Sequence, residues 1–442
     1  MARRAGNLAH CIALSHQALE QTAGSGSIGE ATALVNLSRA YEMSADVSAA
    51  SEQQVHAAIT AGQASRSVFT HLHGTTTLGR LQMLQGRLRA AAATYRETAR
   101  IAGGAPGMHA PAANVGLGTI FLEWNDLEAA QKQLLPAMDL LSVTATIDAD
   151  IVADGYLAFA RLQQAVGSTE AARRTLAELI DVAHRRKVWP GLIARGETMR
   201  AHLALLQGDL AFAQEWATRN GVQIGQELPY GHFTAYLTLA RLWIMQARVA
   251  PAPLLLSDAL HLLDRLSLAA DVDGRKGDVL HVLVLRTMAL QAGGNQAAAL
   301  GVLEQALRLA EPEGYVRVFV DEAAPMAALL EQVAGHTSPI ASYAATLLAT
   351  FPGSPPAQSP TALPAVGPAA NHQPARLLDE PLSVRELEIL GLIALGHSNQ
   401  AIADTLIVAV STVKKHVNNI FGKLAVQSRT QAVVRARALN LL

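Results

Sequence analysis

The segment from Leu382 to Leu442 reads LSVRELEILGLIALGHSNQAIADTLIVAVSTVKKHVNNIFGKLAVQSRTQAVVRARALNLL, and its pattern predicts four short helices. Ser383 and Glu386 have the spacing of a capping box, so the first helix begins there. Gly396 is a natural left-handed stop, and Ser398 caps a second helix. A short turn then leads into a third helix, which is the spacing of a helix-turn-helix unit.

The third helix, from about Val410 to Leu424, separates apolar from polar residues. Its apolar face carries Val413, Val417, Ile420, Phe421 and Leu424. Its other positions include Thr412, Lys414, Lys415, Asn418 and Lys423. No Asp or Glu interrupts this helix, so its polar face can approach DNA phosphates without charge repulsion. A fourth helix begins near Ser428 and ends at Asn440.

These residues resemble the LuxR-type (NarL/GerE) helix-turn-helix domain of bacterial transcription regulators. The resemblance covers the last 60 or so residues. It rests on five stretches: Leu382-Ser383-x-Arg385-Glu386, Gly396-x-Ser398-Asn399-x-x-Ile402-Ala403-x-x-Leu406, Thr412-Val413-Lys414-x-His416-x-x-Asn419-Ile420, Lys423-Leu424-x-Val426 and Arg429-x-x-Ala432. Two positions depart from the pattern, because Ala409 replaces a capping Ser and Asn440 replaces a Gly. Neither lies on the expected reading face.

The resemblance implies that the third helix enters the major groove of double-stranded DNA. The DNA-binding residues that it implies are Ser411, Thr412, Lys414, Lys415, His416, Asn418, Lys423 and Arg429. Lys414, Lys415 and Asn418 are the expected base readers. The residues expected near the DNA backbone are Thr412, His416 and Lys423. For Arg429, a phosphate contact and an ion pair with Glu386 are both open. His416 is not expected to bind a metal, since no second His or Cys lies at ligand spacing.

Composition favours an all-α fold. The chain has 442 residues, half of them apolar and only 4% aromatic, and β-branched runs are sparse. The formal net charge is −1, so any attraction to nucleic acid must come from the local excess of Lys and Arg near the C-terminus. The single cysteine, Cys11, fits a reducing bacterial cytoplasm, and no apolar stretch is long enough to span a membrane.

The region before this domain repeats a turn signal followed by a small residue. The clearest frames are Gly86-Arg87-Leu88 with Ala91, Asn125-Asp126-Leu127 with Ala130, Gly167-Ser168-Thr169 with Ala172, Gly208-Asp209-Leu210 with Ala213, and Gly294-Asn295-Gln296 with Ala299. Weaker frames are Ala45-Asp46-Val47 with Ala50 and Ala247-Arg248-Val249 with Ala252. The small residue recurs every 39 to 47 residues. This period predicts an α-solenoid of TPR-like repeats, each made of two helices, followed by the four-helix domain.

The period resembles the superhelical sensor region of MalT-like large regulators. The stretch AEPEGYVRVFVDEAAPMAALL, residues 310–330, is similar to the segment that closes that array in many of them. Its alternating residues could also form a short strand, but an isolated strand has nothing to pair with. We therefore expect a turn or an irregular helix start.

Three domains are expected: a helical-repeat sensor at 1–350, a Pro-rich flexible linker at 351–379, and the DNA-binding domain at 380–442. Seven prolines lie between residues 351 and 380, where apolar periodicity is nearly absent. The alternative, an ordered Pro-rich loop, requires a long structureless segment within a compact fold.

No enzyme or cofactor site is predicted. MalT-like regulators carry an ATPase module, but the nearest match to its phosphate loop, Gly191-x-x-x-x-Gly196-Glu197-Thr198, has a carboxylate where Lys is needed. The scattered His and Asp residues are expected at surface or turn positions. Because Gly6-Asn7-Leu8 with Cys11 repeats the turn frame, we expect that the chain starts inside a repeat of a longer regulator, with a natural short form as the alternative.

The favoured function is a sequence-specific transcription regulator. Its solenoid groove is expected to receive a small-molecule inducer or a protein, and the chain is expected to act on DNA as a dimer or higher oligomer, with RNA polymerase as a candidate partner. The alternative is an interaction scaffold whose C-terminal domain does not bind DNA.

Overall fold

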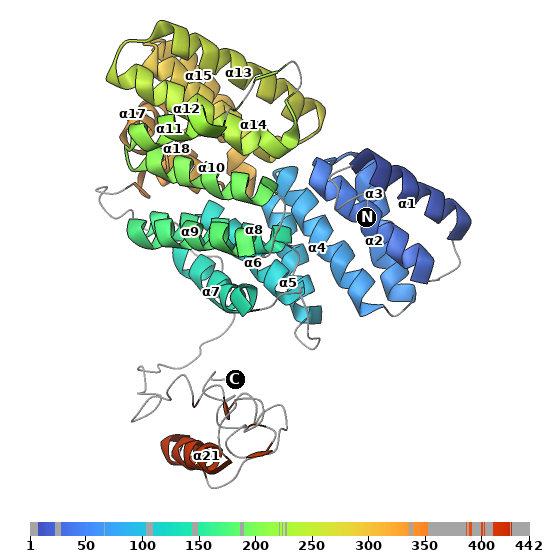
Figure 1. Ribbon diagram of the computed structural model, residues 1–442. Helices are drawn as coiled ribbons and strands as arrows, with labels where there is room; N and C mark the ends of the chain where they lie inside the picture. Colours follow the sequence, from blue (N-terminus) through green and yellow to red (C-terminus); the bar gives the residue numbers. More distant parts are fainter. Residues whose placement is uncertain are drawn as a thin grey trace. The chain divides into compact units, whose positions relative to one another are not determined.

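The chain forms two compact units, Met1–Gln358 and Ser359–Leu442, in a computed structural model (Figure 1). In the first unit the structure describes residues 8–22, 28–65, 67–102, 109–143, 149–185, 190–220, 222, 224–225, 228–335 and 339–351. In the second it describes residues 386, 389–390, 399–400, 402, 410–424 and 426. These residues form helices and turns, with no strand among them, which confirms the all-α prediction.

Helices follow one another along the first unit with short connections. Their bounds are α1 Leu8–Thr22, α2 Ile28–Ser44, α3 Ala49–Ala64, α4 Val68–Leu84, α5 Leu88–Ala102, α6 His109–Glu123, α7 Leu127–Val143, α8 Ala149–Ala165, α9 Thr169–Arg185, α10 Pro190–Leu206, α11 Leu210–Asn220, η1 Tyr230–His232, α12 Phe233–Val249, α13 Pro253–Val272, α14 Lys276–Ala292, α15 Gln296–Ala310, η2 Glu311–Glu313, α16 Arg317–Val320, α17 Ala323–Ala334 and α18 Ala341–Leu348. None of the described helices is both long and apolar enough to cross a bilayer.

The five clearest turn frames form turns between helices, as the sequence predicts. Gly86, Asn125, Gly167, Gly208 and Gly294 all have left-handed backbone angles, with φ between 60° and 81°. Each lies in the turn between two helices, and the next helix begins two residues after it. The small residues of these frames are fully buried, at 0% exposure: Ala91, Ala130, Ala172, Ala213 and Ala299. An Ala at this position lets the second helix of a repeat press against the first.

Of the two weaker frames, one is partly right and the other is wrong. Ala45 does adopt a left-handed angle, with φ 51°, but α3 starts later than the frame requires. The buried small residue is Ser51 rather than Ala50, because Ser48 first caps α3 by accepting a hydrogen bond from the Ser51 amide. The frame at Ala247 is wrong, since this residue lies inside α12.

The helices form an inner and an outer row. Each even-numbered helix from α2 to α14 contacts the next even-numbered helix as well as its neighbours in sequence. The odd-numbered helices from α3 to α13 pack mainly on their sequence neighbours. We call these sets the inner row and the outer row. This arrangement is the predicted solenoid of two-helix repeats.

The solenoid closes on itself through residues Glu311–Val320, which we call the closing segment. The Val316 amide donates a 2.8 Å hydrogen bond to the Glu123 carbonyl, and Trp124 Nε1 donates one of 2.8 Å to the Glu313 carbonyl. The amide of Arg89 donates to the Glu313 carboxylate at 2.9 Å. The closing segment is η2, a turn and α16, so the expectation of a turn or irregular helix start is confirmed.

A glycine permits a second closing contact, between α14 and α4. A Cβ atom at Gly277 would lie only 2.9 Å from the carbonyl oxygen of Met83, which is closer than real side chains approach. The contacts of α14 with α4 and of α16 with α6 join repeats that are far apart in the sequence. The inner row therefore surrounds a space instead of lining an open groove.

Candidate functional site

The second unit is built around α21, Val410–Leu424, which has the bounds predicted from the sequence. Val413 and Ile420 are fully buried and Val417 is nearly so, which confirms the predicted apolar face at these positions. Ile389, Leu390 and Ile402 are also fully buried.

The expected base-reading positions, 414, 415 and 418, share one side of α21 with residue 411. Residues 411, 414, 415 and 418 are spaced by three, four and seven, so helix geometry puts them on one face. Residues 413, 417 and 420 lie about half a turn away, on the buried side. The backbone of α21 therefore separates the two sets as the sequence pattern requires. Arg429 lies outside the described residues.

Lys423 takes part in an ion pair within the domain. Its Nζ donates a 3.0 Å hydrogen bond to Oε2 of Glu386, and the two side chains are only 17% and 4% exposed. Sequence reasoning considered Arg429 as the partner of Glu386 and missed Lys423. The available signal was that Lys423 follows Ile420 by three residues, at the edge of the apolar face. His416 lies near that edge too, and its Nδ1 is buried without a hydrogen-bond partner among the described residues.

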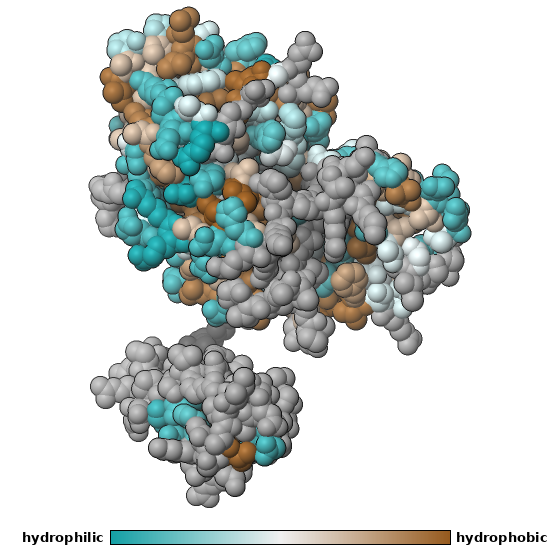
Figure 2. Space-filling model, viewed as in Figure 1, coloured by the Kyte–Doolittle hydropathy of each residue, from teal (hydrophilic) through white to brown (hydrophobic). Residues whose placement is uncertain are grey.

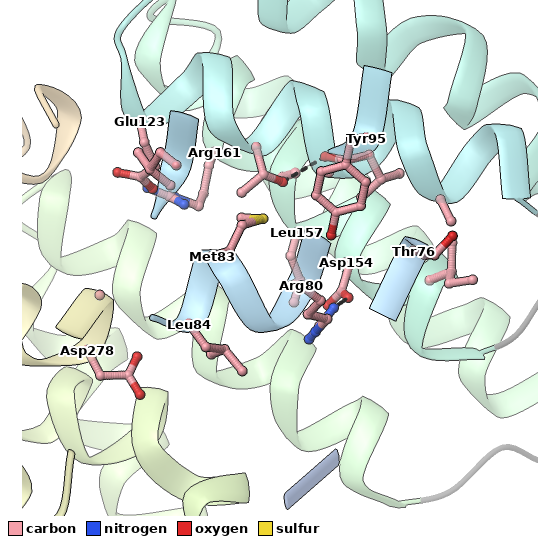
Figure 3. Close-up of a pocket in the computed structure, with 18 of the residues that line it drawn as sticks. Thr76, Arg80, Met83, Leu84, Tyr95, Glu123, Asp154, Leu157, Arg161 and Asp278 are labelled. Atoms are coloured by element: carbon pink, nitrogen blue, oxygen red, sulfur yellow. Dashed lines mark hydrogen bonds and ion pairs between the residues drawn. The ribbon is translucent and has the colours of Figure 1, made fainter. Parts of the chain in front are cut away.

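The inner row of the first unit surrounds a cavity with about 1160 Å³ of empty volume, part of which is open to solvent. Its wall is mostly apolar, with charged residues set into it (Figure 3). The lining residues are Thr76, Arg80, Met83, Leu84, Leu88, Tyr95, Ala112, Val115, Gly116, Thr119, Glu123, Ile151, Asp154, Leu157, Ala158, Arg161, Met199, Gly277, Asp278, His281 and Tyr315. Most of them come from α4, α6, α8 and α14, so the closed solenoid creates the cavity.

Asp154 on α8 is held between two arginines. Arg80 and Arg195 both donate to its carboxylate, and Figure 3 shows Arg80 beside Asp154 in the cavity wall. Burial alone raises the pKa of the Asp154 carboxyl, but the two guanidinium groups lower that pKa to about 2. Asp154 is therefore ionised at neutral pH, and its charge is compensated within the protein.

Glu123 on α6 forms the second charged pair of the wall. Arg161 Nη2 donates a 2.8 Å hydrogen bond to Oε1 of Glu123, and the side chains are 21% and 6% exposed. Burial favours the neutral acid, but Arg161, together with the nearby His281 and Arg317, outweighs it and holds the pKa of the Glu123 carboxyl below its usual value. Oε2 of Glu123 is buried and has no hydrogen-bond partner among the described residues.

A second cavity, with about 860 Å³ of empty volume, adjoins the first. The two share four lining residues: Arg161, Met199, Asp278 and His281. In the second cavity Arg241 pairs with Glu322 at 2.6 Å. The Glu123–Arg161 pair thus lies next to the junction between the two spaces.

The expectation that scattered His and Asp residues lie at surface or turn positions is wrong for Asp154 and His109. His109 is only 7% exposed, and burial lowers its pKa to about 4. A signal for the charged wall was present on α8, where Asp150, Asp154 and Arg161 recur at helical spacing. The candidate phosphate loop, residues 191–198, lies within α10 and is helical. No group of three or more metal-ligating residues occurs in the described part of the chain.

Comparison with known families agrees with both units. A family model described as the MalT-like TPR region matches residues 1–336. A second, described as bacterial regulatory proteins of the luxR family, matches residues 380–436. The first match covers most of the chain and coincides with the closed solenoid, while the second includes α21. The chain therefore belongs to the MalT-like TPR family and is a LuxR-type DNA-binding transcription regulator.

Proposed function

We propose that α21 is the helix that reads operator DNA in the major groove. The observation that carries this proposal is the separation on α21 of a buried apolar face from an opposite face that holds Lys414, Lys415 and Asn418 and no acidic residue. A helix of this kind can lie in the groove while its other side stays in the domain core. Ser411, Thr412, His416 and Arg429 complete the proposed set near the DNA backbone.

In this proposal Lys423 has a structural role in place of the contact near the DNA backbone that the sequence predicted. Because its ammonium group pairs with the buried Glu386, its main contribution is to hold α21 against the segment that contains Glu386. Any phosphate contact by Lys423 would compete with that pair. We therefore place direct base reading on Lys414, Lys415 and Asn418 alone.

We further propose that residues 1–350 sense an effector, that residues 351–379 connect the two units, and that residues 380–442 bind DNA. The cavity of the closed solenoid supports an effector role, because its size and its mostly apolar wall with a few polar groups are typical of small-molecule sites. The expected mode of binding is a dimer that occupies two half-sites about one helical turn apart. RNA polymerase is proposed as a further partner, and no catalytic role is proposed.

The DNA proposal is tested with the full chain and an operator selected from a random pool. Lys414→Ala should reduce discrimination between operator and unrelated DNA by roughly 5- to 150-fold, as expected for a lost base contact worth about 1–3 kcal/mol. Lys132→Ala, which removes an exposed charge on α7 of the repeat unit, is the matched control and should leave discrimination unchanged. Mobility shifts over a salt series measure both variants.

Two outcomes would contradict this proposal. An unchanged ratio of specific to non-specific binding in Lys414→Ala would show that another face of the domain reads DNA. Absence of any salt-dependent DNA binding by the wild-type chain would favour the alternative function, an interaction scaffold.

The effector proposal has its own experiment. A metabolite library is screened by thermal shift on the full chain, and each hit is tested for its effect on operator affinity. Thr119→Trp, which fills the cavity from α6, should abolish both the thermal shift and the change in affinity. Hits that act equally on wild type and Thr119→Trp would bind outside the cavity and contradict the effector role of this site.

A further inference from the structure

The carboxylate of Glu123 is the part of the cavity wall whose hydrogen bonds are incomplete. Its side chain is 6% exposed, Oε1 is bonded to Arg161, and the buried Oε2 has no partner among the described residues. A buried carboxylate oxygen without a donor is costly, and the Glu123 side chain lines the cavity, so a small turn of this side chain that brings Oε2 to an occupant's donor is favoured.

The position of Glu123 is set by two helices and by the closing segment. It is the last residue of α6, its carbonyl accepts the hydrogen bond from the Val316 amide, and Arg161 holds its side chain from α8. A group bonded to Oε2 is therefore in contact with a residue that also fixes the closing segment. A ligand bonded to Oε2 can therefore act on the contact between Glu123 and the closing segment, which closes the solenoid.

The charges around Glu123 are already balanced. Arg161 offsets Glu123, and Arg317 pairs with Asp321 through its Nε at 2.6 Å. Elsewhere in the wall, Asp154 lies between Arg80 and Arg195, and Asp278 pairs with Arg275. An ionised ligand would bring an uncompensated charge into this partly enclosed space, which is more costly than bringing a neutral polar group.

The rest of the wall favours an apolar ligand body. Met83, Leu84 and Leu88 come from the α4–α5 repeat, and Val115, Ile151, Leu157 and Met199 come from the next inner helices. The ring of Tyr95 also lines the cavity (Figure 3). Burial of an apolar surface against these side chains supplies affinity, while the bond to Oε2 supplies orientation.

We propose that the cavity binds a small uncharged molecule with an apolar body and a hydroxyl or amide group, which donates a hydrogen bond to Oε2 of Glu123. This inference rests on the proposed effector role of the cavity and adds the chemical class of the effector. It assigns Glu123 as the residue that selects a neutral donor over an ionised group or a purely apolar molecule.

The test uses the full chain and three probes that share one ring: toluene, benzyl alcohol and benzylammonium. Their dissociation constants are measured by ligand-observed NMR titration. For the wild type, benzyl alcohol should bind about ten-fold or more tightly than toluene, as expected for a hydrogen bond to a charged acceptor. It should also bind more tightly than benzylammonium.

Two variants show whether Glu123 causes this preference. Glu123→Leu combined with Arg161→Met removes both members of the pair, keeps the local charge balanced and should bind benzyl alcohol and toluene about equally. Glu97→Gln, which alters an exposed carboxylate on the outer helix α5, is the control and should keep the wild-type preference. Circular dichroism confirms that each variant is folded before titration.

Tighter binding of benzylammonium than of benzyl alcohol would overturn the inference, and so would an alcohol preference that persists in the double variant. Absence of measurable binding by benzyl alcohol at concentrations where other cavity ligands bind would overturn it as well. The effector role is judged separately, through the response of operator affinity in wild type and Thr119→Trp. The ligand class can therefore fail while the effector role stands.

Discussion

The inner and outer rows of the solenoid use the same residue types in different environments. On the outer helix α5, Arg100 pairs with Glu97, and the two side chains are 72% and 50% exposed. Between the inner helices α6 and α8, Arg161 pairs with Glu123, and the side chains are 21% and 6% exposed. Water screens the first pair and is largely excluded from the second. How much an ion pair stabilises this protein therefore depends on the row in which it lies.

The rows also differ in how their helices are covered. On α5 the buried residues lie on one stripe, whereas on α6 they occur on nearly every side. The exterior of the repeat unit mixes polar and apolar residues, as Figure 2 shows for one face, and single exposed apolar residues such as Leu254 are ordinary there. The outer row maintains the repeat, and the inner row carries the charged residues that line the cavity.

The largest expected effect comes from breaking the inner pair. Arg161→Ala leaves the buried Glu123 carboxylate without its main partner and should cost about 3–5 kcal/mol of unfolding free energy. Urea denaturation of the full chain measures the loss. Arg100→Ala, the outer counterpart, should leave the urea midpoint unchanged within error. Equal losses in the two variants would show that the rows do not differ in this way.

The next effect depends on pH and concerns His109 at the start of α6. Burial lowers its pKa to about 4 in the folded state, from 6.5. Between these values the unfolded chain binds more protons, so stability rises with pH across this window and is fully present above it. The difference between the two pKa values corresponds to about 3 kcal/mol of unfolding free energy. His109→Gln should reduce this dependence between pH 7 and pH 4 by about that amount, as measured by urea midpoints, and leave the share of His202, whose pKa burial also lowers.

The control for this measurement is His184→Gln, on the exposed side of the outer helix α9. It should retain the wild-type pH dependence. A wild-type midpoint that is constant between pH 7 and pH 4, after correction for the control, would contradict the buried neutral state of His109.

A smaller effect tests the repeat frame of the outer row. Ala172 on α9 is fully buried where the outer helix meets the inner one, so Ala172→Leu should overpack this contact and cost about 1–3 kcal/mol. Ala177→Leu, on the exposed side of the same helix, should change stability little. Urea denaturation distinguishes the two. Comparable losses would mean that the small residue is not required for close packing.

The smallest effect extends the comparison to the second unit. Lys423→Ala leaves Glu386 buried without this donor and should lower the opening free energy of α21 amides by about 1–2 kcal/mol in hydrogen exchange. The double variant Lys423→Met with Glu386→Leu removes both charges and should lose less. Loss of DNA affinity without any change in exchange would instead support a direct DNA contact by Lys423.

Local signals predicted much of the fold. The Gly and Asn turns, the buried Ala residues and the bounds of α21 follow from interactions within a few residues, so sequence reasoning found them. The frame at Ala247 failed because Pro253 starts the unusually long α13 and no left-handed residue marks the connection. Proline fixes its own φ and can begin a helix without a glycine before it.

The sequence by itself determined the clearest turns between helices, the small residues buried beside them and the family pattern that the C-terminal segment follows. Tertiary structure decided which charged residues face the cavity. Glu123 and Arg161 are 38 residues apart, and Arg89 and Glu313 are 224 apart, so no local pattern couples them. Glu123 and Arg161 meet because successive inner helices pack side by side, whereas Arg89 and Glu313 meet because the solenoid curves until its closing segment reaches α5 and α6. This curvature is the sum of small rotations between successive repeats.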